Sequence, residues 1–178
     1  MRLWGNMNLK NHIKEFRDFP KPGITFRDIS PVLKDPVLMK YIVEEIYNHF
    51  KDKNIDLIAG IESRGLIFAS VLAMRFNVGS IMVRKRGKLP GDIKEFAYDL
   101  EYGNSVMEIQ HDAVASGQKV LIVDDLLATG GTCKAAAHLV ELLGGKVVGC
   151  AFVIELQNLN GRKHLSNYEI KTLAAYDK

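Results

Sequence analysis

The chain has 178 residues, of which 47% are hydrophobic, and a formal net charge of +3. This length supports one domain over residues 1–178. The sequence has no run of 18 or more apolar residues, which a membrane-spanning helix would need. Lysine and arginine are mixed with aspartate and glutamate, which argues against a nucleic-acid or membrane surface. With two cysteines and no apolar secretory signal, we expect a cytoplasmic protein.

The first segment with a clear pattern, residues 19–31, is too rich in proline and glycine to form a helix. Asp35 and Pro36 then form a typical helix start, with a capping carboxylate followed by a proline in the first turn. Apolar residues follow at four-residue spacing and predict one buried helical stripe: Leu38, Ile42, Ile46 and Phe50.

From residue 56 to about residue 155, apolar blocks of strand length alternate with helical patterns. We predict strands at residues 56–61, 80–83, 119–123 and 147–154, and helices at residues 65–76 and from about Thr132 to Gly144. This alternation predicts an α/β fold with an open, mainly parallel sheet flanked by helices. Right-handed crossovers place the loops that follow the strands at one edge of the sheet, where such folds bind ligands.

Between residues 84 and 118 the pattern changes to that of a polar β-hairpin, over about residues 92–110. Alternating residues lead to a turn at Gly103 and Asn104 and away from it again: Tyr98, Leu100 and Tyr102, then Val106, Glu108 and Gln110. Few of these residues are apolar anchors, so we expect a flexible hairpin that could act as a lid over a site.

The most informative segment is residues 123–132, Val-Asp-Asp-Leu-Leu-Ala-Thr-Gly-Gly-Thr, in which a buried strand passes through a small-residue turn into a helix. Gly130 and Gly131 allow backbone N–H groups to approach an anion, while the neighbouring threonines add hydroxyl groups and the helix start adds partial positive charge. Residues 128–132, called the phosphate loop below, therefore suit a phosphate monoester.

Asp124 and Asp125 would repel that phosphate, so they must face another part of the ligand, either two vicinal hydroxyl groups or a hydrated Mg²⁺ ion. Carboxylates at the edge of a sheet are expected to contribute little to the core. A strand cap and an ordinary turn would be the simpler interpretation of Asp-Asp and Gly-Gly alone, but the full string favours a site. The spacings of a nucleotide-triphosphate loop and of a dinucleotide fingerprint are both missing.

Two further segments could bind anions. Residues 58–65 form a second strand-turn-helix junction in which Arg64 can reach an anion, although a solvated arginine at a helix start is an equally simple interpretation. Residues 84–88, Arg-Lys-Arg-Gly-Lys, place four cations in five positions directly after a strand; we call them the cation run. Solvated charge is the usual explanation of such a run.

Residues 123–132 resemble the phosphoribosyl-pyrophosphate motif of the type I phosphoribosyltransferase family, in the form typical of its adenine-specific members. Separate motifs extend the resemblance from about residue 16 to residue 175, so it is specific. It implies the fold of that family: about five parallel strands, a base-binding hood at about residues 16–34 and a hairpin lid at about residues 92–110. The implied reaction transfers 5-phosphoribosyl from phosphoribosyl pyrophosphate to adenine, giving AMP and diphosphate.

The resemblance also implies roles for individual residues. Asp124 and Asp125 would face the ribose hydroxyl groups, and the loop would hold the 5′-phosphate through Ala128, Thr129, Gly130, Gly131 and Thr132. The pyrophosphate contacts would come from Glu62, Ser63, Arg64, Arg84, Lys85 and Lys88, with Lys88 offered to a neighbouring subunit. In the family, the peptide that corresponds to Glu62–Ser63 is commonly cis.

For the base, the resemblance implies recognition through main-chain groups of Thr25 and Arg27, with Phe26 nearby. Glu101 matches the catalytic glutamate of the family, and Tyr102 would close the site. The implied cofactor is Mg²⁺, which arrives with the donor and has no direct protein ligand, and the implied assembly is a homodimer. A 6-oxopurine phosphoribosyltransferase and a non-catalytic regulator that senses phosphoribosyl pyrophosphate remain as alternatives.

Overall fold

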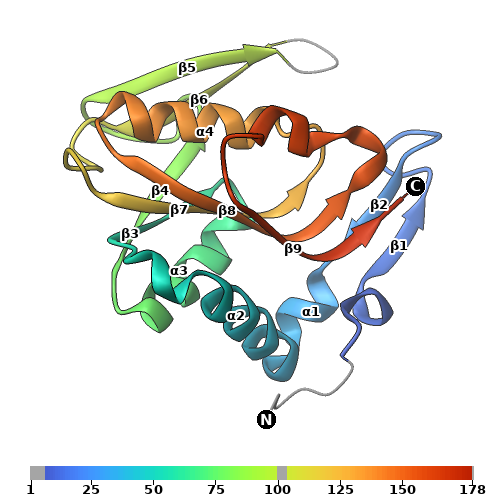
Figure 1. Cartoon of the computed structure of the whole chain (residues 1–178). Coiled ribbons are helices and arrows are strands. Elements are labelled where there is room, and N and C mark those ends of the chain that lie inside the picture. Colours follow the sequence, from blue (N-terminus) through green and yellow to red (C-terminus); the bar gives the residue numbers. More distant parts are fainter. Residues whose placement is uncertain (1–6, 100–103, 178) are drawn as a thin grey trace.

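The computed structural model describes residues 7–99 and 104–177, and its central element is a seven-stranded sheet in the order β5-β6-β4-β3-β7-β8-β9 (Figure 1). Five neighbouring strands are parallel. Their bounds are Leu57–Ile61 for β3, Gly79–Lys85 for β4, Lys119–Leu127 for β7, Lys146–Leu156 for β8 and Ile170–Tyr176 for β9. The antiparallel hairpin of β5 (Ile93–Asp99) and β6 (Asn104–Gln110) joins the sheet along β4. The predicted open, mainly parallel sheet is confirmed.

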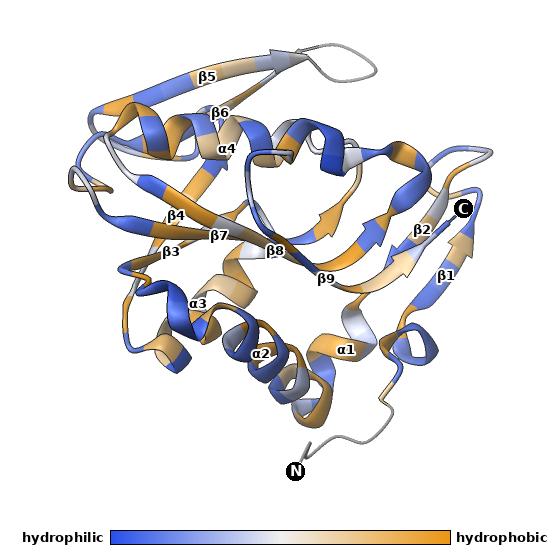
Figure 2. Cartoon of the chain, viewed as in Figure 1, coloured by the Kyte–Doolittle hydropathy of each residue, from blue (hydrophilic) through white to orange (hydrophobic). Residues whose placement is uncertain are grey.

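Helices cover both faces of the parallel strands, with α2 (Pro36–Phe50) and α3 (Gly65–Phe76) on one face and α4 (Gly131–Leu142) on the other (Figure 1). Successive strand residues point to opposite faces. Leu121 of β7 therefore packs in the α2 and α3 core, whereas Ile122 packs in the α4 core. Strands buried on both faces read as continuous apolar runs, which explains the largely orange inner strands in Figure 2.

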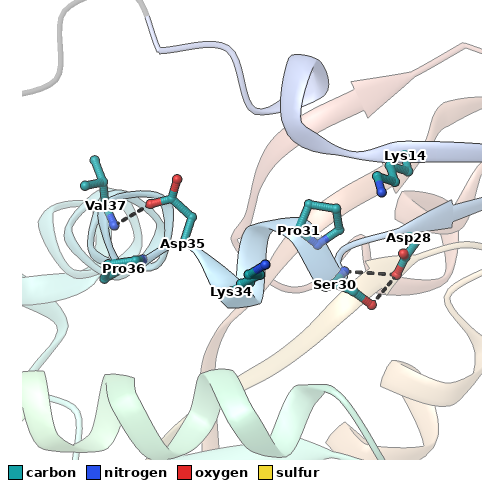
Figure 3. A pocket seen from close by; sticks show the side chains of 8 residues that line it. All are labelled: Lys14, Asp28, Ser30, Pro31, Lys34, Asp35, Pro36 and Val37. Carbon is teal, nitrogen blue, oxygen red and sulfur yellow. Dashed lines mark hydrogen bonds between the residues drawn. The ribbon is translucent and has the colours of Figure 1, made fainter.

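The predicted helix start at Asp35 is confirmed. The Asp35 carboxylate accepts hydrogen bonds from the Val37 N–H at 2.8 Å and the Leu38 N–H at 3.3 Å. All four residues of the predicted stripe are buried. The start of α2 lines an open groove of about 710 Å³ with residues of β1, β2 and α1 (Figure 3).

The segment before α2 is more regular than its prolines and glycines predict. Strand β1 (Lys14–Arg17) pairs with β2 (Thr25–Asp28) in a separate two-stranded sheet. A short helix, α1 (Ser30–Lys34), follows, and the Asp28 carboxylate accepts hydrogen bonds from the N–H and hydroxyl groups of Ser30 at its start (Figure 3). This local carboxylate bond explains why the chain turns into a helix at this point. The segment is therefore free of helix up to residue 29, as predicted, but it contains strand β2 and becomes helical at Ser30.

The hairpin is confirmed, but its base has more apolar anchors than the sequence pattern predicts. Met107 and Ile109 of β6 are fully buried in the core that includes α4. Phe96 of β5 lies against His138 of α4, with the ring centroids 4.1 Å apart. These anchors are not obvious in the sequence because a strand that covers a helix needs apolar residues only at every second position, so the strand as a whole looks polar.

The described residues contain further short elements before β1, after α2 and after β8. They are the 3-10 helices Leu9–His12, Lys51–Lys53, Gln157–Leu159 and Gly161–Leu165, labelled η1 to η4. No helix within the described residues is both long and apolar enough to cross a lipid bilayer. Strand β9 and η4 are not singled out by the sequence pattern, yet both border the site described next.

Candidate functional site

The parallel strands β3, β4, β7 and β8 end at the same edge of the sheet, and each is followed by polar residues. The segment after β3 is the turn at residues 62–64, and the end of β4 carries the cation run. Strand β7 is followed by the phosphate loop, and β8 leads to η3 and η4. The topology thus brings together three of the segments that the sequence singles out. This edge is where open α/β sheets bind ligands.

The phosphate loop lines a small cavity of about 60 Å³ together with the end of β7. Gly130 is the N-cap of α4 and has a φ of +85°, a left-handed conformation that favours glycine. Since Gly130 has no side chain, it cannot cap the first N–H groups of the helix, and these groups can bind an anion instead. Thr129 lines the cavity as well, and Thr132 adds a hydroxyl group at the first turn.

The two carboxylates at the end of β7 are buried, with residue exposures of 9% for Asp124 and 7% for Asp125. The expectation that they would contribute little to the core is wrong, because β7 continues to Leu127 and carries both residues inside the sheet. The Asp124 Oδ1 atom accepts a hydrogen bond from the Asp125 N–H at 2.8 Å. Burial raises the pKa of Asp124 well above its ordinary value, and the neighbouring Asp125 charge raises it further.

Arg64 is held at the same point and is not a freely solvated arginine. Its Nη2 atom lies 2.8 Å from the Asp125 Oδ2 atom, in an ion pair that links the turn after β3 to the end of β7. Gly65 makes this approach possible, since a Cβ atom there would lie 2.7 Å from the Val123 carbonyl oxygen. Ser63 is exposed beside Arg64, and the Glu62–Ser63 peptide is cis.

Glu62 connects this turn to the cation run. Its Oε2 atom accepts a hydrogen bond from the Lys85 N–H at 2.7 Å and lies 3.3 Å from the Arg84 Nε atom. Burial raises the pKa of Glu62, but the Lys85 N–H bond and Arg84 outweigh it, so the pKa lies below its ordinary value. The Glu62 side chain therefore faces the cations, while Lys88 is exposed at the end of the run.

The segment predicted as a hood reaches the same edge. The Phe26 ring lies 5.6 Å from the Arg64 guanidinium carbon, and the edge of Phe19 meets it with centroids 5.3 Å apart. The Arg27 guanidinium lies over the ring of Tyr176, 4.1 Å from its centroid, at the end of β9. Strand β2 is thereby attached to the main sheet, and its residues Thr25, Phe26 and Arg27 are half-buried.

Two predicted residues, Glu101 and Tyr102, lie outside the described residues. The strand that leads to them does contact the phosphate loop, because the Tyr98 hydroxyl lies 2.9 Å from the Thr132 Oγ1 atom. The sequence pattern places Tyr98 in the hairpin and assigns it no partner. This hydrogen bond spans 34 residues and has no local signal.

The segment that supports the phosphate loop has no clear signal in the sequence. A Cβ atom on Gly130 would lie 2.5 Å from the Gly161 carbonyl oxygen, so the backbone of η4 lies directly against the loop. Arg162 binds the buried Glu155 through two hydrogen bonds of 2.6 and 2.8 Å, and the Thr172 hydroxyl donates to the same carboxylate at 2.8 Å. This network holds η4 between β8 and β9 and thereby fixes the position of the loop.

Cys133, at the first turn of α4, is buried, as expected for a structural residue. A contact with Cys150 and burial raise the pKa of its thiol well above the ordinary value. A thiol in this environment is a poor nucleophile.

Comparison with known proteins gives a consistent family. Residues 34–175 match the family model described as phosphoribosyl transferase domain. The chain is 56% identical over 170 residues to the adenine phosphoribosyltransferase of Nitrosopumilus maritimus, covering 96% of this chain and all of that protein. The structure resembles the crystal structure of adenine phosphoribosyltransferase from Thermoanaerobacter pseudethanolicus, with a TM-score of 0.91 and 49% identity over 94% of this chain and 98% of that one. It also resembles the Saccharomyces cerevisiae enzyme complexed with an imino-altritol bisphosphate and adenine, with a TM-score of 0.88 and 40% identity over 93% and 96% of the two chains.

The buried Asp124 predicts a stability effect that depends on pH. A carboxyl group whose pKa is raised by folding stabilises the fold below its unfolded pKa, and this contribution is lost as the pH rises through the folded pKa. Asp124→Asn keeps an oxygen for the Asp125 N–H and removes the charge. We expect the free energy of unfolding of the variant to exceed that of the wild type by an amount that grows with pH. The increase should begin near pH 4, since the ordinary pKa of an aspartate is about 4.

Urea unfolding of both proteins across a pH series measures this difference. Asp56→Asn is the matched control, because the Asp56 carboxylate also accepts a backbone N–H bond, from Lys119 at 2.7 Å, but lies outside the carboxylate pair. A variant Asp124→Asn that is less stable than the wild type at every pH would contradict this explanation.

Proposed function

The chain belongs to the phosphoribosyltransferase family, and on that premise we propose how its residues carry out the reaction. It is an enzyme of the adenine-specific branch, a pentosyltransferase of class EC 2.4.2.7 that transfers 5-phosphoribosyl from phosphoribosyl pyrophosphate to adenine, giving AMP and diphosphate. The observation that carries the site proposal is the convergence of the phosphate loop, the buried carboxylates and the Arg64 turn. Nothing in the fold or the relatives favours a 6-oxopurine enzyme or a regulator.

The phosphate loop is proposed to bind the 5′-phosphate through the N–H groups of Gly130 and Gly131 and the hydroxyl groups of Thr129 and Thr132, with Ala128 at the entrance. Asp124 and Asp125 then accept hydrogen bonds from the ribose hydroxyl groups. Their burial at the start of the phosphate loop supports this assignment, because a desolvated carboxylate gains from hydrogen bonds that ligand hydroxyl groups donate.

The pyrophosphate is proposed to bind between the Arg64 turn and the cation run. Ser63 and Arg64 approach it from the turn, and Arg84 and Lys85 approach it from the run, while the Glu62 carboxylate keeps the two segments together. Donor binding would replace the Arg64–Asp125 ion pair, which frees a cation for the pyrophosphate and a carboxylate for the ribose. Two binding groups that neutralise each other in the free protein become available in the same step.

Adenine is proposed to bind against the hood, where Phe26 packs near the base and main-chain groups of Thr25 and Arg27 read its edge. A carbonyl group accepts from the exocyclic amine of adenine, and an N–H group donates to ring N1. Hypoxanthine reverses both roles and would leave two unsatisfied groups, at about 1–3 kcal/mol each. The contacts of Phe26 with Arg64 and of Arg27 with Tyr176 support this position for the hood.

Glu101 is proposed to act at the reacting centre, either by managing a proton at purine N7 or by stabilising the positive charge that develops on the ribose. Tyr102 would cover the site and exclude water, which would otherwise hydrolyse the donor. The hairpin base supports both roles, because Phe96 and Tyr98 attach β5 to α4 immediately before these residues.

Mg²⁺ is proposed to accompany the donor. Within residues 7–99 and 104–177, no three histidine, cysteine, aspartate or glutamate side chains come together as a metal site. The residues present fit an ion held mainly through pyrophosphate oxygens and water, with Asp124 and Asp125 as the nearest acidic groups. When bound, Mg²⁺ supplies positive charge that stabilises the leaving pyrophosphate.

We also propose that the chain forms a homodimer and is located in the cytoplasm. The exposed position of Lys88 supports its offer to a neighbouring subunit's pyrophosphate site.

The base preference is tested directly by comparing adenine, hypoxanthine, guanine and xanthine as substrates with phosphoribosyl pyrophosphate and Mg²⁺. We expect kcat/KM for adenine to exceed that for hypoxanthine by at least about tenfold, since two unsatisfied groups together cost about 2 kcal/mol or more. Excess chelator should abolish turnover. Equal turnover of hypoxanthine would contradict the main-chain recognition, and full activity with chelator would contradict the role of Mg²⁺.

Glu101→Gln is expected to slow the chemical step by about 10²–10⁴-fold, the usual range for a positioned acid or base, while substrate affinities change little. Glutamine keeps the size of the side chain but loses its charge. Single-turnover measurements are required, because slow product release could hide the loss. Glu95→Gln is the matched control, since Glu95 lies on the same hairpin and pairs with Arg86 at 3.2 Å. A wild-type single-turnover rate in Glu101→Gln would remove this residue from the mechanism.

A further inference from the structure

Tyr98 makes a contact that the proposed reaction leaves without a role. Its phenol hydroxyl lies 2.9 Å from the Oγ1 atom of Thr132, and either oxygen could be the donor. Both residues are half-buried. Thr132 belongs to the phosphate loop, whereas Tyr98 belongs to β5, so the bond joins the hairpin to the anion site.

The position of the phenol is fixed by its surroundings. Tyr98 pairs with Ser105 of β6 in the hairpin register, and the following residues of β6 are anchored in the core by Met107 and Ile109. Phe96, two residues earlier and therefore on the same face of β5, lies against His138 of α4. Strand β5 thus contacts α4 at two points, one of which is the first turn that carries Thr132.

A bound phosphate determines the direction of this hydrogen bond. The Thr132 hydroxyl has one proton and two acceptor sites, and a phosphate monoester near neutral pH acts mainly as an acceptor. Thr132 must therefore donate its proton to the phosphate. The Tyr98 contact can persist only if the phenol donates to Thr132 Oγ1, which forms a chain from Tyr98 through Thr132 to the phosphate. Hydrogen bonds arranged in such a chain strengthen one another.

We propose that Tyr98 is a positioning residue, which orients the Thr132 hydroxyl toward the 5′-phosphate and so couples phosphate binding to the hairpin that carries Glu101. The inference rests on the proposed function, because it takes Thr132 as a phosphate ligand. Glu101 follows Tyr98 by three residues in the chain. Phosphate binding strengthens the bond that holds β5 on α4, so the strand before the catalytic glutamate is held most firmly when the donor is present.

A double-mutant cycle on AMP binding tests this coupling. Tyr98→Phe removes the hydroxyl and keeps the ring, and Thr132→Val removes the other hydroxyl at nearly constant volume. By calorimetry we expect Tyr98→Phe to weaken AMP binding about three- to tenfold, the usual effect of one hydrogen bond. In the Thr132→Val background the same change should have no further effect, because Tyr98 acts through Thr132. Thr132→Ser restores the hydroxyl and should restore the sensitivity to Tyr98→Phe.

Two controls separate this role from a general effect on the fold. Tyr168→Phe is the matched variant, because the Tyr168 hydroxyl also binds α4, donating to Glu141 Oε1 at 2.8 Å, but far from the phosphate loop in the chain. It should leave AMP affinity unchanged. Adenosine lacks the phosphate, and its affinity should be the same in the wild type and in Tyr98→Phe.

The outcomes distinguish the inference from the proposed function. Wild-type AMP affinity in Tyr98→Phe, or full additivity of the two changes, would overturn the coupling while leaving Thr132 as a phosphate ligand. Unchanged AMP affinity in Thr132→Val would instead remove Thr132 from the phosphate site, and the inference would fall with it. An equal loss of adenosine affinity would show that Tyr98 acts on the general shape of the site and would also overturn the proposal.

Discussion

Two carboxylates, Asp124 and Asp125, lie next to each other inside the sheet at the end of β7, with one ion pair from Arg64 to balance them. Burial and mutual repulsion disfavour the charged forms, so this arrangement reduces the stability of the free protein. The proposed role in donor binding explains why it is present. In the proposed site, these desolvated acceptors form strong hydrogen bonds with the ribose hydroxyl groups, and the Arg64 ion pair compensates their charge until the donor binds. Such a conflict between stability and activity is common at binding sites.

Contacts from the surrounding segments hold this edge of the sheet in place. Gly65 lets the Arg64 turn approach the β7 backbone, and Gly130 lets η4 lie against the phosphate loop. The Glu155–Arg162–Thr172 network then fixes η4 to β8 and β9. These contacts come from segments far apart in the sequence. They provide a rigid frame, so that binding energy is not spent on ordering the loop when the donor arrives.

The features that the sequence predicts well have local causes. The stripe from Leu38 to Phe50 follows helix periodicity, and β7 with its Gly-Gly turn combines a buried strand with a helix start in adjacent residues. The features that it misses depend on tertiary approach. Each of these contacts joins residues that are separated in the chain and have no periodic pattern in common. They are the pairing of β1 with β2, the pairing of β9 with β8, the Arg64–Asp125 ion pair and the Tyr98–Thr132 hydrogen bond. The burial of Asp124 and Asp125 is also not evident from the sequence, since β7 extends farther than its apolar run.

The buried carboxylate pair is proposed to hold the phosphoribosyl donor. Calorimetric binding of phosphoribosyl pyrophosphate with Mg²⁺ to the wild type and to the Asp124→Asn, Asp125→Asn double variant tests it most directly. Each hydrogen bond to a charged group contributes about 1.5–3 kcal/mol, so donor affinity should fall by at least about tenfold, while the circular dichroism of the variant stays that of the folded protein. A folded double variant that binds the donor as tightly as the wild type would contradict the account.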